Sequence, residues 1–149
     1  MNRPIKFRAW VDGEHKEYGG SVLKAKPHME ENVCVNGNGH YIWVDGFNGD
    51  RIRGAYATVP LMQFTGLTDK NGKEIYEGDV VREVLWSAQQ KKDVLQEIRW
   101  SDVNGGFWVG SAYPLNQGAS QDLEIVGNIY ENPELLAPQP HHSDLPNNN

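Results

Sequence analysis

The pattern of apolar and polar residues along this chain predicts short β-strands rather than helices. From Ile5 to Val11 every second residue is apolar, which is the two-residue period of a strand with one buried face. Residues 80–86 carry branched apolar side chains on both faces, as expected of a strand that is covered on both sides. The same reasoning predicts strands at residues 41–44, 94–100, 107–109 and 123–130.

Seven Asp-Gly or Asn-Gly pairs punctuate the chain and predict tight turns between these strands. Such pairs tolerate the positive φ that two-residue hairpin turns require. They occur at residues 12–13, 36–37, 38–39, 45–46, 48–49, 71–72 and 104–105. Residues 87–93 are interpreted as a long hairpin loop. The chain is therefore expected to fold as many short hairpins.

One short helix is predicted near the end of the chain. Asn132 can cap it, Pro133 suits its first position, and Glu134 is favoured at the positive end of the helix dipole. Pro138 limits this helix to a turn or two, and the polar tail that follows is predicted to be disordered. The predicted fold class is mainly β, with a β-rich α+β fold as the alternative.

The strand pattern changes near residue 60, which divides the chain into predicted parts. Residues 1–60 form a glycine-rich, irregular β subdomain with short strands. Residues 61–136 contain regularly spaced strands, which is the pattern of a small β-barrel. Residues 137–149 form the disordered tail. A chain of 149 residues is long enough for one domain or two small ones, and it can bury a core without disulfide bonds.

The cysteine count and the absence of targeting signals favour a cytoplasmic protein. Cys34 is the single cysteine, so no disulfide can form within the chain, which fits a reducing compartment. It lies between Val33 and Val35 and is expected to be a buried strand residue rather than a reactive thiol. No leader peptide is visible, and no apolar run approaches the roughly 20 residues that a membrane helix needs.

The charge of the chain is negative and unevenly distributed. Residues 1–60 carry eight basic and seven acidic residues, whereas residues 61–149 carry six basic and thirteen acidic ones, which gives a net charge of −6. Nucleic-acid binding gains affinity from a basic surface that displaces counterions from phosphate. The acidic second part therefore disfavours nucleic acid as a partner. A local basic patch could still be formed by Arg3, Lys6 and Arg8 or by Lys24 and Lys26.

Three segments of the chain are distinctive. They are residues 5–10 (IKFRAW), residues 65–81 (TGLTDKNGKEIYEGDVV) and residues 125–136 (IVGNIYENPELL). In content and order they resemble the YopX family of bacteriophage and prophage proteins. The resemblance implies a phage or prophage origin, a bacterial host cytoplasm and an SH3-like barrel in the C-terminal part. It implies no activity and no catalytic residues. Residues 11–59 depart from the family pattern.

The same segments have a structural interpretation. Asn71-Gly72 makes a tight hairpin, and Gly78 turns the chain into the next strand in a conformation that side chains disfavour. Gly127 interrupts the last strand and predicts a bulge or a close backbone approach, and Asn128 can bond to the backbone at the strand end. The residues expected to build these motifs are Gly66, Asn71, Gly72, Gly78, Asp79, Gly127, Asn128, Asn132 and Pro133.

No motif in the sequence points to catalysis, to a metal or to a cofactor. The histidines are His15, His28, His40, His141 and His142, and they lack the paired spacing of a zinc site. Glu77 and Asp79 flank Gly78, but neighbouring carboxylates at a turn are ordinary. No nucleophile elbow, phosphate-binding loop or dinucleotide fingerprint is present. We therefore predict no enzymatic activity, no cofactor, no metal and no catalytic residue.

Aromatic residues offer the best candidate for an interaction surface. Trp10 lies opposite the apolar face of the first strand, and Trp108 lies opposite Phe107 and Val109. At least one of these tryptophans is therefore expected at the surface or at an interface, unless both strand faces are buried. With the neighbouring basic residues, the candidate interaction surface consists of Lys6, Arg8, Trp10 and Trp108.

These observations leave two main functional hypotheses and, as a minor third one, an enzyme with an unfamiliar site. The first is a non-enzymatic binding or assembly module that self-associates as a homo-oligomer and also has a host protein as a candidate partner. It follows from the unpaired aromatic residues, the strand edges and the lack of a catalytic set. The second is a nucleic-acid-binding protein that uses the barrel face and the basic first strand, which the overall charge disfavours. Neither hypothesis involves a membrane.

Overall fold

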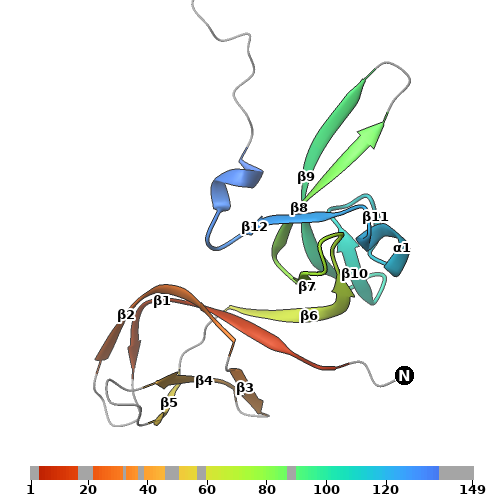
Figure 1. The fold of residues 1–149 in the computed structure, drawn as a ribbon. Coiled ribbons are helices and arrows are strands. Elements are labelled where there is room, and N and C mark those ends of the chain that lie inside the picture. Colours follow the sequence, from red (N-terminus) through yellow and green to blue (C-terminus); the bar gives the residue numbers. More distant parts are fainter. Residues whose placement is uncertain are drawn as a thin grey trace, which may run out of the picture.

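The computed structural model describes residues 4–16, 22–31, 33–36, 39–45, 51–56, 60–86 and 90–137. In these ranges the strands form three antiparallel sheets (Figure 1). Two short helices, α1 (Gln117–Ser120) and the 3₁₀ helix η1 (Pro133–Leu136), lie toward the C-terminal end of the same ranges. The mainly β fold with a short helix near the C-terminus is therefore confirmed. None of the helices in these ranges is long and apolar enough to cross a membrane.

A four-stranded sheet combines the start of the chain with its middle. Its strand order is β2-β1-β6-β7. The strands are β1 (Phe7–Lys16), β2 (Val22–Glu30), β6 (Leu61–Thr68) and β7 (Glu74–Tyr76). The ladder between β1 and β6 crosses the boundary predicted near residue 60, where Ala9 pairs with Leu61. The division of the chain into domains stays a prediction.

A five-stranded sheet forms the C-terminal part, with the order β11-β10-β9-β8-β12. Its strands are β8 (Asp79–Trp86), β9 (Lys91–Ser101), β10 (Gly106–Val109), β11 (Tyr113–Pro114) and β12 (Glu124–Asn128). The sheet curls into a half-barrel (Figure 1). The third sheet has the order β3-β4-β5 and consists of β3 (Val33–Asn36), β4 (Gly39–Asp45) and β5 (Arg51–Tyr56).

The core of the half-barrel is a cluster of aliphatic side chains from different strands. Its fully buried members are Ile75, Val81, Ile98, Val109 and Leu123. Because Ile75 belongs to β7, this core also joins the half-barrel to the four-stranded sheet. Burial of apolar area, at about 25 cal/mol per Å², is the main term that stabilises such a core. The polar turns of the chain are arranged around it.

Three of the glycines predicted to lie in turns have the positive φ that such turns need. Gly72 and Gly105 have φ of +80° and +63° and lie in the β6–β7 and β9–β10 turns. Gly78 has φ of +82°, as expected where the chain enters β8. Gly127 lies at a register shift in β12, and an added Cβ would lie 2.8 Å from Cδ1 of Leu135. Both features predicted for Gly127, a bulge and a close approach, are present.

One predicted turn is wrong, and one predicted loop has a different end. The pair Asp12-Gly13 does not form a turn, because β1 continues to Lys16 with a register shift between Val11 and Gly13. A glycine at such an irregularity bends a strand without reversing it. The loop predicted at residues 87–93 is shorter than expected, because β9 already begins at Lys91 and pairs with β8 from there.

The helices also differ from the sequence-based expectation. Pro133 begins η1, but this is a 3₁₀ helix, and the Asn132 side chain makes no capping hydrogen bond. Asn128 instead supports the turn before η1, because its Oδ1 accepts from the backbone N–H groups of Tyr130 and Glu131 at 3.0 and 2.9 Å. Helix α1 was not predicted, since it is a single turn.

The predicted apolar face of the first strand is only partly buried. Ala9 and Val11 are fully buried, whereas 75% of Ile5 is exposed. Ile5 lies before β1 begins. The side chain of Cys34, the glycine-rich turns at residues 37–38 and 46–50, and the predicted tail after Ala137 lie outside the described residues.

Candidate functional site

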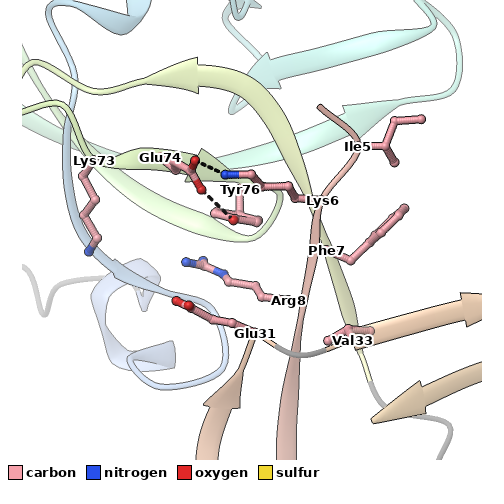
Figure 2. Close-up of a pocket in the computed structure, with 9 residues that line it drawn as sticks. All are labelled: Ile5, Lys6, Phe7, Arg8, Glu31, Val33, Lys73, Glu74 and Tyr76. Carbon is pink, nitrogen blue, oxygen red and sulfur yellow. Dashed lines mark hydrogen bonds and ion pairs between the residues drawn. The ribbon is translucent and has the colours of Figure 1, made fainter. Parts of the chain in front are cut away.

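A pocket of about 560 Å³ lies where the N-terminal segment meets β7 and the connection from β2 to β3 (Figure 2). We call it the β1 groove. Its lining residues are Ile5, Lys6, Phe7, Arg8, Glu31, Val33, Lys73, Glu74 and Tyr76. The set mixes apolar side chains with both signs of charge. It therefore differs from the largely apolar pockets that bury small organic ligands.

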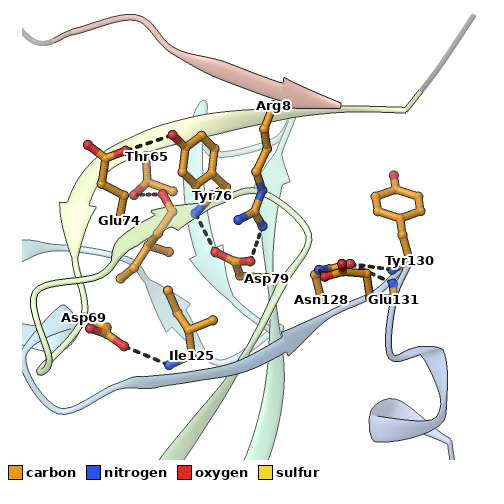
Figure 3. Close-up of polar contacts among 11 residues, drawn as sticks. Arg8, Thr65, Asp69, Glu74, Tyr76, Asp79, Ile125, Asn128, Tyr130 and Glu131 are labelled. Carbon is orange, nitrogen blue, oxygen red and sulfur yellow. Dashed lines mark hydrogen bonds and ion pairs between the residues drawn. The ribbon is translucent and has the colours of Figure 1, made fainter. Parts of the chain in front are cut away.

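Arg8 links the first strand to the start of the half-barrel. Its guanidinium forms an ion pair with Asp79, whose side chain is almost completely buried. The guanidinium also lies over the ring of Tyr76, 4.4 Å from the ring centroid. Asp79 accepts a second hydrogen bond, from the backbone N–H of Tyr76 at 2.8 Å (Figure 3). A buried carboxylate needs such partners, because an unpaired one would lose its hydration without compensation.

Lys6 forms a second charged contact on the same side of the strand. Its ammonium group pairs with Oε1 of Glu74, and the Tyr76 hydroxyl donates to Oε2 of Glu74 at 2.9 Å (Figure 2). Lys6 also lies 5.3 Å from the ring centroid of Phe64. Side chains two residues apart on an extended chain share a face, which places Lys6 beside Glu74 and Arg8 over Tyr76 on the same side of the chain.

These contacts shift the pKa values of three groups. Burial, together with the hydrogen bond to Glu74, raises the pKa of Tyr76 to about 12. The hydrogen bond from Lys6 lowers the pKa of Glu74. Burial raises the pKa of Asp79, although the nearby Arg8 guanidinium opposes this shift. At neutral pH the phenol is therefore a neutral hydrogen-bond donor and Glu74 is an ionised acceptor.

The pKa shifts of Tyr76 and Glu74 are unlike those of a general acid or base that works at neutral pH. A general base is most effective when its pKa is close to the working pH, and the shifts of Tyr76 and Glu74 move both pKa values away from neutrality. Within the described ranges, no three His, Cys, Asp or Glu side chains converge on a position that could hold a metal ion. The lining of the groove combines charged side chains, hydrogen-bond donors and apolar side chains.

Further polar contacts hold the elements behind the groove (Figure 3). Asp69 is buried and accepts backbone hydrogen bonds from its own turn and from Ile125 in β12. Thr65 donates to the carbonyl of Ile75 at 2.8 Å. Asn128 also donates through its amide to Glu131. These contacts give a structural role to polar residues in the two distinctive segments, residues 65–81 and 125–136.

The structure brings together only part of the predicted interaction surface. Lys6 and Arg8 line the groove, and Trp10 follows on β1, where it is half-buried and pairs with Met29. Trp108 is also half-buried, but it lies on β10 in the other sheet. Among the tryptophans whose side chains are described, Trp100 is the most exposed, at 43%. The role of these residues in an interface stays a prediction.

Sequence reasoning missed most of the groove. Glu74 and Tyr76 are two residues apart on β7, and Lys6 and Arg8 are two residues apart at the start of the chain. In the structure Lys6 pairs with Glu74, and Arg8 lies over Tyr76. The alternation itself was a visible signal. The register that joins the two pairs was not visible, because β6 connects β1 to β7 and the residues of β6 that pair with β1 lie more than 50 positions away in sequence.

Comparisons with known proteins agree with this fold. A crystal structure of protein EF1440 from Enterococcus faecalis superimposes with a TM-score of 0.51 and 26% sequence identity, covering 91% of this chain and 99% of that one. No curated protein matches the chain. The family model described as YopX protein matches residues 6–137, which include every residue of the groove except Ile5. The chain therefore belongs to the YopX family.

Proposed function

We propose that this YopX-family chain is a non-enzymatic binding and assembly module that self-associates. The observation that supports the proposal is that the basic side chains of the β1 groove are held in ion pairs. Lys6 is paired with Glu74, and Arg8 is paired with the buried Asp79. Groups held in this way give a fixed surface for recognition, because their positions are set before any partner arrives.

A hairpin that projects from the half-barrel supports self-association. Residues 83–86 of β8 pair with residues 91–94 of β9, and we call this segment the arm. The described ladder between β12 and β8 ends at Arg82, and that between β10 and β9 ends at Ile98. In the described residues the arm therefore has two strands and two uncovered edges (Figure 1). A two-stranded hairpin is only marginally stable by itself.

The β8 edge of the arm is the better candidate for contact with a second copy. Lys91 and Lys92 lie on β9, and lysines at an edge strand discourage pairing with another chain. On β8, Leu85 is an apolar residue next to the end of the strand, and 44% of it is exposed. Full burial of an exposed leucine contributes about 1.5–3 kcal/mol, so covering the exposed part of Leu85 contributes a fraction of that. Contact with a second copy would bury this side chain and cover the open edge.

Light scattering coupled to size-exclusion chromatography tests self-association. At micromolar concentration the wild-type protein should elute as a dimer or a larger assembly, and Leu85→Lys should shift it toward the monomer. Val103→Lys is the matched control, because Val103 is 94% exposed in the β9–β10 turn, outside the arm. Circular dichroism shows whether both variants keep their strands. A monomeric wild-type protein would remove self-association from the proposal.

Nucleic-acid binding through the first strand receives little support from the same contacts. Lys6 and Arg8 each have a carboxylate partner, so they have less positive charge to offer phosphate. A polarisation assay with single- and double-stranded DNA at low salt tests this alternative under the conditions that favour it most. Tight binding that weakens steeply with added salt would overturn the preference for a protein partner. The location in a bacterial cytoplasm stays a prediction.

A further inference from the structure

The β8 edge of the arm opens beyond Arg82, where the ladder with β12 ends. Glu124 lies opposite Arg82, so a longer ladder would place residues 121–123 along the arm. The chain turns away there instead, because the N–H groups of residues 121–123 donate to carbonyls of α1. A pocket of about 410 Å³ is lined by Val84 and by residues of this turn. The residues that could extend the ladder are thus described, and they leave this edge.

Two backbone hydrogen bonds show which way the residues of β9 face. The carbonyl of Ile98 accepts from the N–H of Gly78 at 2.7 Å, on the β8 side of the strand. The carbonyl of Glu97 accepts from the N–H of Gly110 at 2.8 Å, on the β10 side. In an antiparallel ladder, successive residues turn their N–H and C=O groups to alternate sides. The even-numbered residues of β9 therefore bond toward β8.

This alternation fixes the backbone groups at the open edge. The residues of β9 opposite Glu83 and Leu85 are even-numbered, and the ladder between the two strands has no register shift. Glu83 and Leu85 therefore use their N–H and C=O groups within the arm. Val84 and Trp86 turn theirs toward the open edge. The edge thus offers two donors and two acceptors, separated by one residue whose side chain is apolar and 44% exposed.

The charge of the arm suits a second copy of the same chain. The whole chain has a net charge of −6, so two copies repel each other on average. Residues 83–86 and 91–94 carry two acidic and two basic residues, and the arm is therefore neutral. Two copies can meet at the arm without net repulsion, whereas a strongly charged partner such as nucleic acid gains no attraction there.

We propose that two copies pair through their β8 edges, antiparallel and about a two-fold axis, with Leu85 opposite the partner's Leu85. This inference rests on the proposed self-association and specifies its contact. An interface about a two-fold axis needs a patch that is complementary to itself. In this register Val84 lies opposite the partner's Trp86 on each side of the axis, and each such pair exchanges two hydrogen bonds. The arms then form one continuous sheet.

Neighbouring registers are weaker. An axis at Val84 leaves one bonded pair, because Arg82 lies opposite Glu124 of β12 and is not free to pair with Trp86 of the partner subunit. An axis at Glu83 sets two carboxylates directly opposite each other, which is destabilising. The register at Leu85 instead forms a non-hydrogen-bonded pair of leucines, whose Cα atoms are about 4.5 Å apart.

Disulfide cross-linking of the full chain tests this register. In a Cys34→Ser background, oxidised glutathione should join two copies of Leu85→Cys, since it accepts the two electrons and two protons that the thiols lose. Opposed Cα atoms about 4.5 Å apart are within disulfide range, whereas two copies of Val84→Cys are about 8 Å apart and are not. Leu85→Cys should therefore cross-link at least about tenfold faster than Val84→Cys. Val103→Cys, outside the arm, measures random collisions.

Hydrogen exchange of the wild-type chain tests the same register without a substitution. The amides of Val84 and Trp86 should exchange more slowly as the protein concentration rises, and those of Glu83 and Leu85 should change less. Suppose that light scattering finds a dimer. Equal cross-linking at all three positions, or exchange at Val84 that ignores concentration, then overturns this register and leaves self-association standing. A monomer in light scattering overturns both.

Discussion

Asp69 ties a local turn to a distant strand, and its replacement gives the sharpest test of how this fold is held together. Only 2% of the residue is exposed. Its Oδ1 accepts from the backbone N–H groups of Asn71 and Lys73, both at 2.9 Å. Its Oδ2 accepts from the N–H of Ile125 at 3.0 Å, across 56 residues of sequence (Figure 3). One carboxylate therefore satisfies three backbone donors.

Asp69→Asn keeps the size of the side chain but replaces one acceptor with a donor. The remaining oxygen can serve the turn or Ile125, and the amide NH₂ then faces a backbone N–H. A hydrogen bond to a charged group contributes about 1.5–3 kcal/mol, and a buried donor without a partner costs about 1–3 kcal/mol. We expect the variant to lower the free energy of unfolding by about 2–4 kcal/mol.

Urea unfolding followed by tryptophan fluorescence measures this loss. The control is Asp102→Asn, which changes an exposed aspartate in the β9–β10 turn. Hydrogen exchange adds a local measurement, because the amide of Ile125 should lose protection in Asp69→Asn only. Ordinary surface substitutions change the free energy of unfolding by no more than about 0.5 kcal/mol. If the value for Asp69→Asn lay that close to the value for the control, the reasoning would be refuted. So would an Ile125 amide that keeps its full protection.

Three further predictions concern a buried acid and the glycines. Burial raises the pKa of Asp79 in the folded protein, so its contribution to stability is fully present below the ordinary aspartate pKa and is lost as pH rises through the raised value. In urea unfolding at a series of pH values, the stability of the wild-type protein relative to Asp79→Asn should therefore fall as pH rises, and an increase would contradict this. Gly127→Ala brings a methyl group to 2.8 Å from a side chain of η1 and should lower the free energy of unfolding by about 1–3 kcal/mol, which lowers the melting temperature. The control is Gly106→Ala, whose methyl group meets no atom within 4 Å and should leave the melting temperature nearly unchanged. Gly72→Ala places a side chain at φ of +80° in open surroundings and should lower the free energy of unfolding by about 1–2 kcal/mol. Gly78→Ala combines φ of +82° with a methyl contact of 3.1 Å and should lower it further. Equal losses in the two variants would show that crowding adds nothing.

Features set by single residues or short spacings were predictable from the sequence. The Asn71-Gly72 turn, the positive φ of Gly78 and the irregularity at Gly127 all depend on the absence of a side chain at one position. The mainly β fold followed from alternation within each strand. The same local reasoning failed at Asp12-Gly13, because a pair that permits a turn does not require one, and pairing with β2 kept the strand extended.

The pairing of distant strands was decided by the tertiary structure. Nothing within residues 5–11 specifies that β1 lies against β6 rather than against another strand with an apolar face, and this choice places Arg8 over Tyr76 and beside Asp79. Lys6 and Arg8 were therefore visible in the sequence as cations, but their carboxylate partners were not. The groove exists because the described β1–β2 ladder begins only at Ala9 and because β7 is brought in by β6.

The sequence by itself determined that this chain forms short strands joined by glycine turns, because backbone conformation at a turn is a property of the residues in that turn. Which strand edges are covered and which charges are neutralised was decided only by the tertiary structure. Both depend on contacts between residues such as Arg8 and Asp79, which lie 71 positions apart. Burial sets the energy of such a contact, and burial is a property of the assembled fold.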